Sequence, residues 1–251
     1  MKKIVTLLGL AAFSFAGQAV AVEKGFKSIF DGKTLDGWDG DPKFWSVEDG
    51  SITGKTTKEN PTKGNTFIIW NGGKTGDFEL RLDYKIVGGN SGIQYRSFKL
   101  KNGADQWRVG GYQADIDSGP TYSGICYGEA FRGILSLRGK KTILQVGEDG
   151  KIKKSVEEFS KDADVAKAVK NEKWNSYRIV ARNFNLTQYI NGVKTTQVID
   201  RDKKTRRADG LLALQLHAGP PMKVQFKNIR IKELAKRKSK AGAAKKGEAK
   251  K

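Results

Sequence analysis

The sequence predicts an all-β protein, folded as a sandwich of two antiparallel sheets. Short segments in which apolar and polar residues alternate follow one another along most of the chain, as is typical of half-buried strands. Turn-forming pairs such as Asp49-Gly50 and Asn191-Gly192 lie between such segments and predict hairpins. The sequence shows no regular succession of strands and helices of the kind that builds a parallel sheet. About a dozen short strands in one domain favour a sandwich.

The two ends of the chain depart from this pattern. Residues 1–21 have the form of a secretory signal peptide, with Lys2 and Lys3, then an apolar run, then the small-residue cleavage site Ala19-Val20-Ala21. The apolar run is shorter than the roughly 20 residues that a membrane span needs, so we expect no transmembrane segment after cleavage, with an uncleaved anchor as the alternative. Residues 235–251 hold eight Lys or Arg and one Glu. A stretch without large apolar residues cannot bury a core, so we expect a disordered tail.

These assignments leave one domain over residues 22–234 and place it in the periplasm or outside the cell. The formal net charge is +20, of which the tail contributes +7. Such a tail is suited to contact anionic envelope polymers by charge alone, with a merely solvated terminus as the alternative. No aromatic-rich basic module is present, so a specific nucleic-acid partner is not expected. The single cysteine, Cys126, cannot form an internal disulfide, and its strand-like surroundings predict a buried, inert thiol.

The strands are expected in the following order. Residues 44–55 form a hairpin around Asp49-Gly50, and residues 77–89 alternate cleanly between apolar and charged side chains. Residues 155–173 have the composition of a short helix or a loop, and Lys227-Asn228 is expected to form a bulge in the last strand. The remaining strand segments are 91–98, 110–117, 133–139, 141–152, 174–200, 210–217 and 222–234.

Polar side chains gather on one face of the segment 111–119. Because side chains alternate along a strand, Gln113, Asp115 and Asp117 point one way while their neighbours point the other way. Burying three acceptor-rich side chains is costly unless that face is wet or binds something. The segment therefore predicts either a binding surface or the solvent-facing side of an ordinary sheet.

Two other segments show the same feature. Gln94 and Arg96 share one face of a predicted strand, and Gln215 and His217 share one face of another. His217 is the only histidine of the chain, and a histidine can act as an acid, a base or a metal ligand. A site of several histidines around zinc is thereby excluded, whereas an oxygen-ligand site for Ca²⁺ or a similar cation at Asp115, Asp117 or Glu129 stays open.

Five blocks of the sequence together resemble the 3-keto-disaccharide hydrolase family, a group of exported bacterial proteins with a concanavalin A-like jelly roll. The resemblance runs from Phe26 to Leu234 and implies this jelly-roll fold. The blocks are "FKSIFDGKTLDGW", "FELRLDYKIVGGNSGIQYRS", "GYQADIDSG" with "YGEAFRG", "KWNSYRIVARNFNLTQYINGV" and "GLLALQLHAGPPMKVQFKNIRIKEL".

The resemblance also implies a substrate whose sugar ring carries a ketone at C3. That ketone acidifies the C2 proton, whose removal gives an enolate that expels the group at C1, and water then adds to the unsaturated sugar. Such a route needs a base near C2, a positive or hydrogen-bonding group at the C3 oxygen, and an acid near the leaving oxygen. A bound divalent cation is an alternative to a positive side chain, and no other cofactor is implied.

On this basis we expect catalytic roles for a few residues of the polar faces. Arg96 suits the clamp on the enolate, because a guanidinium keeps its charge when partly buried. The family pattern often has Glu and Gln where this chain has Gln113 and Asp115, so the identity of the base is open. The candidate catalytic residues are Asp115, His217, Arg96 and Glu129; the candidate substrate contacts are Asn90, Gln113, Asp117, Arg132, Gln215, Trp107 and Tyr127.

The alternative to these functional roles is a structural one, in which Arg96 forms an ion pair with Asp115 and Glu129 forms an ion pair with Arg132. Two other classes of function stay open at this stage. A non-catalytic, lectin-like carbohydrate-binding module of the cell envelope would use the same surface without a base. A structural envelope protein would instead depend on the lysine-rich tail.

Overall fold

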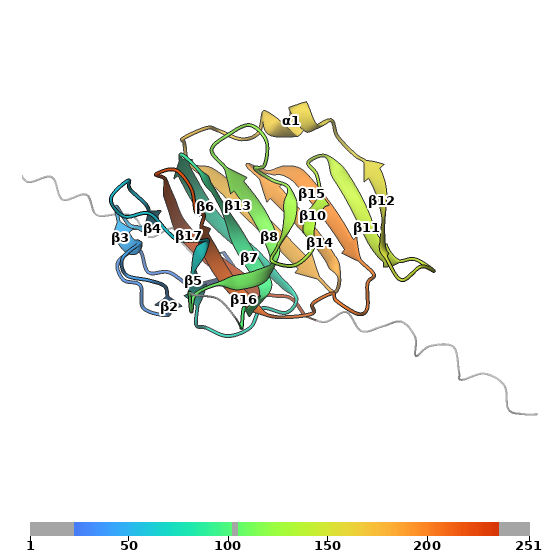
Figure 1. The fold of residues 1–251 in the computed structure, drawn as a ribbon, viewed down its shortest axis with the longest axis horizontal. Coiled ribbons are helices and arrows are strands. Elements are labelled where there is room, and N and C mark those ends of the chain that lie inside the picture. The colour runs from blue at the N-terminus through green and yellow to red at the C-terminus, as the bar shows by residue number, and fades with distance from the viewer. Residues whose placement is uncertain (1–22, 102–104, 236–251) are drawn as a thin grey trace, which may run out of the picture.

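The structure, a computed structural model, describes residues 23–101 and 105–235. Within these residues, seventeen strands and one short helix form two sheets that face each other (Figure 1). The predicted all-β sandwich is thereby confirmed. The predicted signal peptide (1–21) lies outside the described residues, as does the predicted tail apart from Ala235. No helix among the described residues is long and apolar enough to cross a membrane.

The larger sheet has ten strands. One of them, the short β1, pairs with β17 and lies off the main order of the sheet. All its neighbouring strands are antiparallel except β11 and β15, which run parallel and depart from the fully antiparallel prediction. In order across the sheet the strands are β12 (Ile152–Glu158), β11 (Lys140–Val146), β15 (Val193–Asp200), β14 (Asn185–Ile190), β13 (Asn175–Arg182), β6 (Phe78–Val87), β17 (Lys223–Glu233), β4 (Ser51–Lys55) and β3 (Trp45–Glu48), with β1 at Lys27–Ser28.

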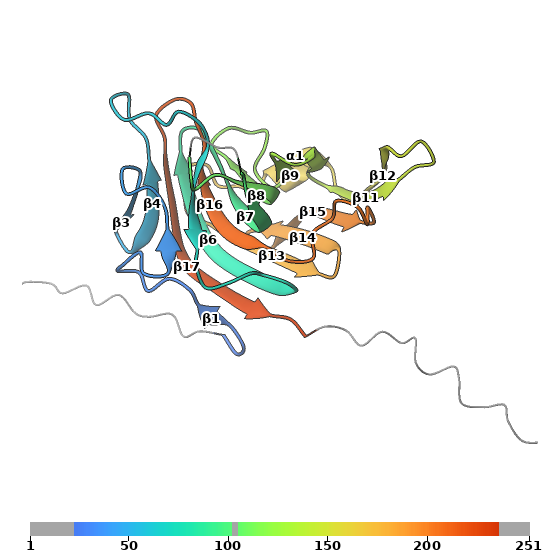
Figure 2. The same ribbon diagram turned by 60° about the horizontal axis from the view of Figure 1, so that its bottom comes forward.

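The smaller sheet has seven strands, all antiparallel to their neighbours. Its central strands lie across the middle of the larger sheet, and the β11–β12 hairpin stands at the far end of the larger sheet (Figure 2). In order across the sheet the strands are β10 (Gly133–Ser136), β9 (Cys126–Glu129), β8 (Val109–Asp117), β7 (Asn90–Lys99), β16 (Leu211–Leu216), β5 (Thr66–Trp70) and β2 (Trp38–Asp39).

The core fills the space between the two sheets. Alternation along β6 sends Phe78, Leu80, Leu82 and Tyr84 into this space, where each is 1% exposed. Burying one such side chain stabilises a protein by roughly 1.5–3 kcal/mol, so this layer contributes substantially to the fold's stability. The predicted burial of Cys126 in the core is confirmed, and burial raises the pKa of its thiol to about 12.

The turns form as their residues predict. Asp49 and Gly50 have φ of 50° and 70°, and Asn191 and Gly192 have φ of 48° and 81°, which are the two consecutive positive values of a type I′ hairpin turn. The expected bulge in β17 is confirmed by a register shift between Lys227 and Arg230.

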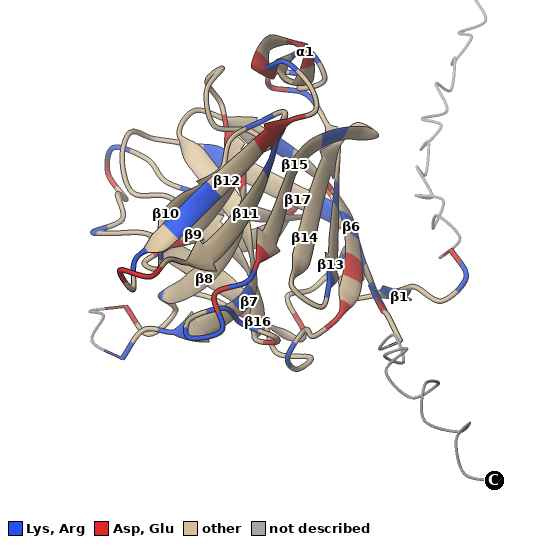
Figure 3. Cartoon of the chain, turned by 90° about the vertical axis from the view of Figure 1, so that its right-hand side faces the viewer, with Lys and Arg blue, Asp and Glu red and all other residues tan. Residues whose placement is uncertain are grey.

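The segment 155–173 differs from its prediction. Its first residues continue β12, and only Asp162–Ala166 are helical, as α1. The strand β12 cannot be recognised from the alternation of apolar and polar residues, because all of its residues are exposed and it has no buried apolar face. Lys153 and Lys154 precede Glu157 and Glu158 along it, so basic and acidic side chains occupy successive parts of this edge (Figure 3). Glu157 and Glu158 pair with Lys141 and Lys140 of β11.

Candidate functional site

The outer face of the smaller sheet, which points away from the core, is polar at its centre. Alternation places Tyr112, Ala114 and Ile116 of β8 in the core and turns Gln113 and Asp115 outward. The neighbouring strands contribute further outward polar side chains. These are Gln94 of β7, Gln215 of β16 and Glu129 of β9, and the five outward residues are only 0–7% exposed.

These buried polar groups satisfy one another through a continuous chain of hydrogen bonds. Gln94 Nε2 donates to Gln113 Oε1 at 2.5 Å, and Gln113 Nε2 donates to Asp115 Oδ1 at 2.5 Å and to Gln215 Oε1 at 3.4 Å. Gln215 Nε2 donates in turn to Glu129 Oε2 at 3.4 Å. Glutamine suits the middle of such a chain because its amide both donates and accepts. The chain links Asp115 to Glu129 through neutral groups.

Gly92 makes room for this arrangement. It lies opposite Asp115 in the register of β7 and β8. A Cβ atom at Gly92 would lie 2.5 Å from Cγ and Cδ of Gln113. The side chain of Gln113 therefore crosses β7 in the space that any other residue at position 92 would occupy, and in this way it reaches Gln215.

Asp115 is the group whose ionisation is most altered on this face. Burial raises its pKa to about 7, against the opposing effect of hydrogen bonds from Gln113 and from Asn90 Nδ2, which lies 3.2 Å from Oδ2. The charges of Asp117 and Glu129 raise the pKa further. A carboxyl group that titrates near neutral pH is suited to accept a proton as a general base.

His217 and Asn65 mark the edge of the polar face. The half-buried His217 directly follows β16, and its Nδ1 donates to the carbonyl oxygen of Ala218 at 2.5 Å. This contact fixes the hydrogen of the neutral ring on Nδ1 and leaves Nε2 as an acceptor. Asn65, just before β5, accepts from the backbone N–H of Ala218 at 3.0 Å and donates to Glu129 Oε1 at 3.1 Å.

Tyr127 and Asp117 also lie at this face. Tyr127 of β9 is opposite Gln113 and half-buried, and burial followed by the charges of Glu129 and Asp115 raises the pKa of its phenol. Asp117 ends β8 and accepts from the backbone N–H of Tyr122 at 3.2 Å. The prediction of a shared polar surface therefore holds for most of its residues. Asp115, Glu129, His217, Asn90, Gln113, Asp117, Gln215 and Tyr127 belong to the polar face or its edge.

The prediction for Arg96 is wrong. A bulge shifts the register of β7 between Tyr95 and Phe98, and Arg96 takes a φ of 48°. Strand parity is broken there, so Arg96 does not share the face of Gln94. Its fully buried guanidinium donates to the carbonyl oxygens of Gly76 (2.9 Å), Asn183 (2.5 Å) and Arg207 (3.3 Å) and pairs with Asp77 (3.0 Å) instead of Asp115.

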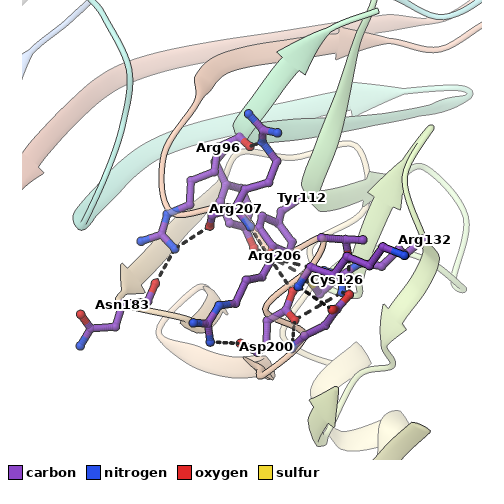
Figure 4. A network of polar contacts seen from close by, with 12 residues as sticks. Arg96, Tyr112, Cys126, Arg132, Asn183, Asp200, Arg206 and Arg207 are labelled. Atoms are coloured by element: carbon purple, nitrogen blue, oxygen red, sulfur yellow. Dashed lines mark hydrogen bonds and ion pairs between the residues drawn. The ribbon is translucent and has the colours of Figure 1, made fainter. Parts of the chain in front are cut away.

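The prediction for Arg132 as a substrate contact is also wrong, and it forms no ion pair with Glu129. The chain reverses after β9, with Ala130 at a φ of 44°, and turns Arg132 toward the inner side of the sandwich. There its guanidinium pairs with the fully buried Asp200, beside the hydroxyl of Tyr112 (Figure 4). Burial and the charge of Asp200 raise the pKa of Tyr112, so its phenol stays protonated.

Trp107 lies outside the polar face, in the loop that precedes β8. Its indole N–H donates to Asp39 Oδ1 at 2.7 Å. It lines a groove of about 680 Å³ between the loop of residues 60–66 and residues 105–108. Asn65 also lines this groove, so the groove adjoins the polar face through Asn65.

Sequence reasoning missed two contributors to the site. Gln94 is predicted to lie on a polar face but is not among the candidate site residues, although its strand position and amide side chain point to the site. Asn65 stands before an apolar strand, and no local pattern points to it. Among residues 23–101 and 105–235, no three His, Cys, Asp or Glu side chains gather in a way that could hold a metal ion.

Comparison with known proteins identifies the family. The model of the 3-keto-alpha-glucoside-1,2-lyase-like domain family matches residues 25–232, which is most of the chain. The chain belongs to this family. A 3-keto-disaccharide hydrolase of Bacteroides thetaiotaomicron is 40% identical to this family member over 83 residues, which cover 28% of the chain and 27% of the relative. The aligned part is thus about a quarter of that relative's length.

Solved structures support the same fold for this 3-keto-alpha-glucoside-1,2-lyase-like domain. A proposed glycosyl hydrolase from Parabacteroides distasonis superimposes with a TM-score of 0.54 at 20% identity, over 86% of this chain and 99% of the other. The Crh5 transglycosylase, solved in complex with NAG, superimposes with a TM-score of 0.51 at 13% identity, over 84% and 85%. At these identities the likeness establishes the jelly-roll fold, as predicted, and nothing finer.

Proposed function

We propose that this domain cleaves glycosides of 3-keto sugars, with Asp115 as the base that removes the proton from C2. One observation carries the proposal: a carboxyl group with a pKa of about 7 is buried on a polar sheet face among amide groups. The family description and the name of the matched hydrolase support this substrate class.

The reaction begins with proton transfer from C2 to the Asp115 carboxylate. The electron pair left at C2 becomes an enolate whose charge rests on the C3 oxygen. The enolate re-forms the ketone as the C1–O bond breaks, and the leaving oxygen takes up the proton held by Asp115. Water then adds across the C1=C2 bond, with hydroxyl going to C1 and hydrogen to C2. The sum is hydrolysis of the glycosidic bond.

The enolate needs hydrogen-bond donors at the C3 oxygen. With Arg96 on the inner side of the sandwich, the donors on the outer face include the side-chain amides and the phenol hydroxyl of Tyr127. An amide group has two N–H donors. Asn90 uses one of them on Asp115 Oδ2, so its second N–H is suited to the oxygen of a substrate held against that carboxylate.

The decisive experiment follows the fate of C2. Purified protein is incubated with 3-keto-trehalose or 3-keto-lactose in D₂O, and sugar release and deuterium at C2 of the keto sugar are measured. Elimination and hydration place solvent deuterium at C2, whereas direct hydrolysis does not. The free 3-keto sugar in D₂O without protein controls for spontaneous exchange.

Two variants and a chelator complete the design. Asp115→Asn is expected to reduce the rate about 10²–10⁴-fold, the range of a lost general base. Asp36→Asn, at an exposed position, is the matched control. A loss of activity in chelator would support a divalent cation as an additional electrophile. Glycan binding without any release from a 3-keto-glycoside would overturn the proposal in favour of a carbohydrate-binding module.

We also propose that the protein acts after export, in the periplasm or outside the cell. The amino-acid pattern of residues 1–21 supports this location. The mass of the native protein from fractionated cells tests it, because cleavage after Ala21 removes these residues. A full-length protein confined to the cytoplasmic fraction would contradict export.

A further inference from the structure

We propose that the groove beside Asn65 binds the leaving group of the substrate and selects a sugar in that position. The groove lies between the loop of residues 60–66 and residues 105–108, and we call it the Thr66 groove. The inference rests on the proposed function and deepens it, because it states on which side of the scissile bond the protein recognises a second sugar.

The first argument is a cluster of buried polar atoms without partners. Of the seven buried side-chain nitrogen and oxygen atoms that lack a hydrogen-bond partner among the described residues, three belong to residues that line this groove. They are Thr62 Oγ1, Thr66 Oγ1 and Arg108 Nε, and Thr66 is only 2% exposed. Leaving such an atom unpaired costs about 1–3 kcal/mol, so native proteins rarely gather them without a use.

The chemistry of these atoms defines the ligand. Two hydroxyl groups both donate and accept, and the guanidinium nitrogen donates. A ring that carries several hydroxyl groups offers donors and acceptors that match these groups. Charges of both signs line the groove, with Lys43, Lys63 and Arg108 beside Asp41 and Asp105. The three cations and the two carboxylates nearly cancel, which suits a neutral polar ligand.

The walls and the size of the groove also suit a sugar. The indole of Trp107 is held by its N–H bond to Asp39, and the backbone N–H of Trp107 donates to Asp105 Oδ1 at 2.8 Å. A fixed aromatic ring offers a surface for the apolar side of a pyranose. The volume of about 680 Å³ lies within the roughly 300–1,000 Å³ that is typical of small-molecule sites.

The orientation follows from Asn65. This residue lines the groove and at the same time bonds Glu129 and the backbone beside His217. Asp115 instead accepts a hydrogen bond from Asn90 of the neighbouring strand β7. In the proposed binding mode, C2 of the keto sugar lies against Asp115 and its C1 substituent extends past Asn65 into the Thr66 groove.

The test compares two substrates that differ only in the leaving group. The probes are 3-keto-trehalose, which releases a sugar, and methyl 3-keto-α-glucoside, which releases methanol. The wild-type ratio of kcat/KM for the disaccharide to that for the methyl glycoside is expected to exceed about tenfold, since one or two good hydrogen bonds discriminate by that amount. Thr66→Val, which removes the unpaired hydroxyl, is expected to lower the ratio about five- to tenfold without reducing the melting temperature.

The matched control is Thr75→Val. Thr75 is equally buried, but its hydroxyl donates to the carbonyl oxygen of Gly210 at 3.2 Å, away from the groove. This variant is expected to lower the melting temperature and leave the substrate ratio unchanged. A wild-type ratio near one, or a ratio that Thr66→Val changes no more than Thr75→Val, would overturn the subsite.

Failure of the proposed function gives a different result. If neither probe is cleaved, the cleavage reaction is wrong and the groove is tested by calorimetric titration with unmodified trehalose. Weaker binding to Thr66→Val than to wild type or Thr75→Val then supports a sugar subsite, and equal binding to all three proteins contradicts it.

Discussion

Gln113 donates a hydrogen bond of 2.5 Å to Asp115, two residues farther along the same strand. The direction of this bond is determined by Ser97, through the amide of Gln94. Ser97 Oγ donates to Gln94 Oε1 at 2.8 Å, which turns the Gln94 amide so that its nitrogen donates to Gln113 Oε1. The nitrogen of Gln113 is then left to face Asp115. A hydroxyl at the bulge of β7 thus fixes the orientation of the Gln113 amide that faces the proposed base.

The raised pKa of Asp115 predicts the pH dependence of cleavage. A base must be ionised to accept a proton, so kcat/KM for a 3-keto-glycoside should rise with pH and level off above a midpoint of about 7. Initial rates at low substrate concentration over a range of buffers measure this profile. A midpoint near the ordinary value for a carboxyl group would show that another group is the base.

The same pKa predicts an effect on stability. The unfolded carboxyl, with a pKa near 3.8, loses its proton before the folded one, with a pKa of about 7. Between these values the folded state binds more protons, so stability falls as pH rises. From about pH 5 to about pH 8, wild type should lose about 3 kcal/mol relative to Asp115→Asn, at about 1.4 kcal/mol per pH unit below the folded pKa. Urea denaturation at the two pH values measures the difference, and parallel changes in both proteins would contradict it.

Gly92→Ala should disturb the site more than the fold. The added methyl group would meet Gln113 and push its amide away from Asp115 and Gln215. We expect a loss of about 1–3 kcal/mol in stability and about 10- to 100-fold in kcat. Gly76→Ala is the control, since a Cβ there meets no atom within 4 Å. Activity of Gly92→Ala equal to that of Gly76→Ala would show that the Gln113 bridge is unimportant.

Arg96→Ala should destabilise the protein strongly. It removes a buried partner of Asp77 and leaves three carbonyl oxygens without their donor, which costs about 3–5 kcal/mol in buried ion pairs. Arg178→Ala, which breaks a pair with Glu79 from a side chain that is 41% exposed, should cost no more than about 1 kcal/mol. Chemical denaturation compares the two variants. Near-wild-type stability of Arg96→Ala, with activity lost, would restore a catalytic role.

Sequence reasoning succeeded where the chain keeps a regular pleat. Between Tyr112 and Asp117 the strand β8 has no bulge, and the outward orientation of Gln113 and Asp115 follows from alternation alone. The predictions for Arg96 and Arg132 failed because a bulge and a chain reversal interrupt the alternation of side chains. Neither feature is visible in the sequence pattern. Asn65 could not be found either, since its contacts are to residues far away in the sequence.

The bulge in β7 has a consequence for comparing members of this family. Before the bulge Gln94 reaches the outer face and Tyr95 the core, whereas Arg96 reaches the inside of the sandwich. In a regular strand without the bulge, alternation would turn an arginine at this position to the outer face. Roles in this strand should therefore be transferred by counting from the bulge in a structure. An insertion or deletion at positions 96–97 would mark a change in the chemistry of the site rather than a neutral difference in length.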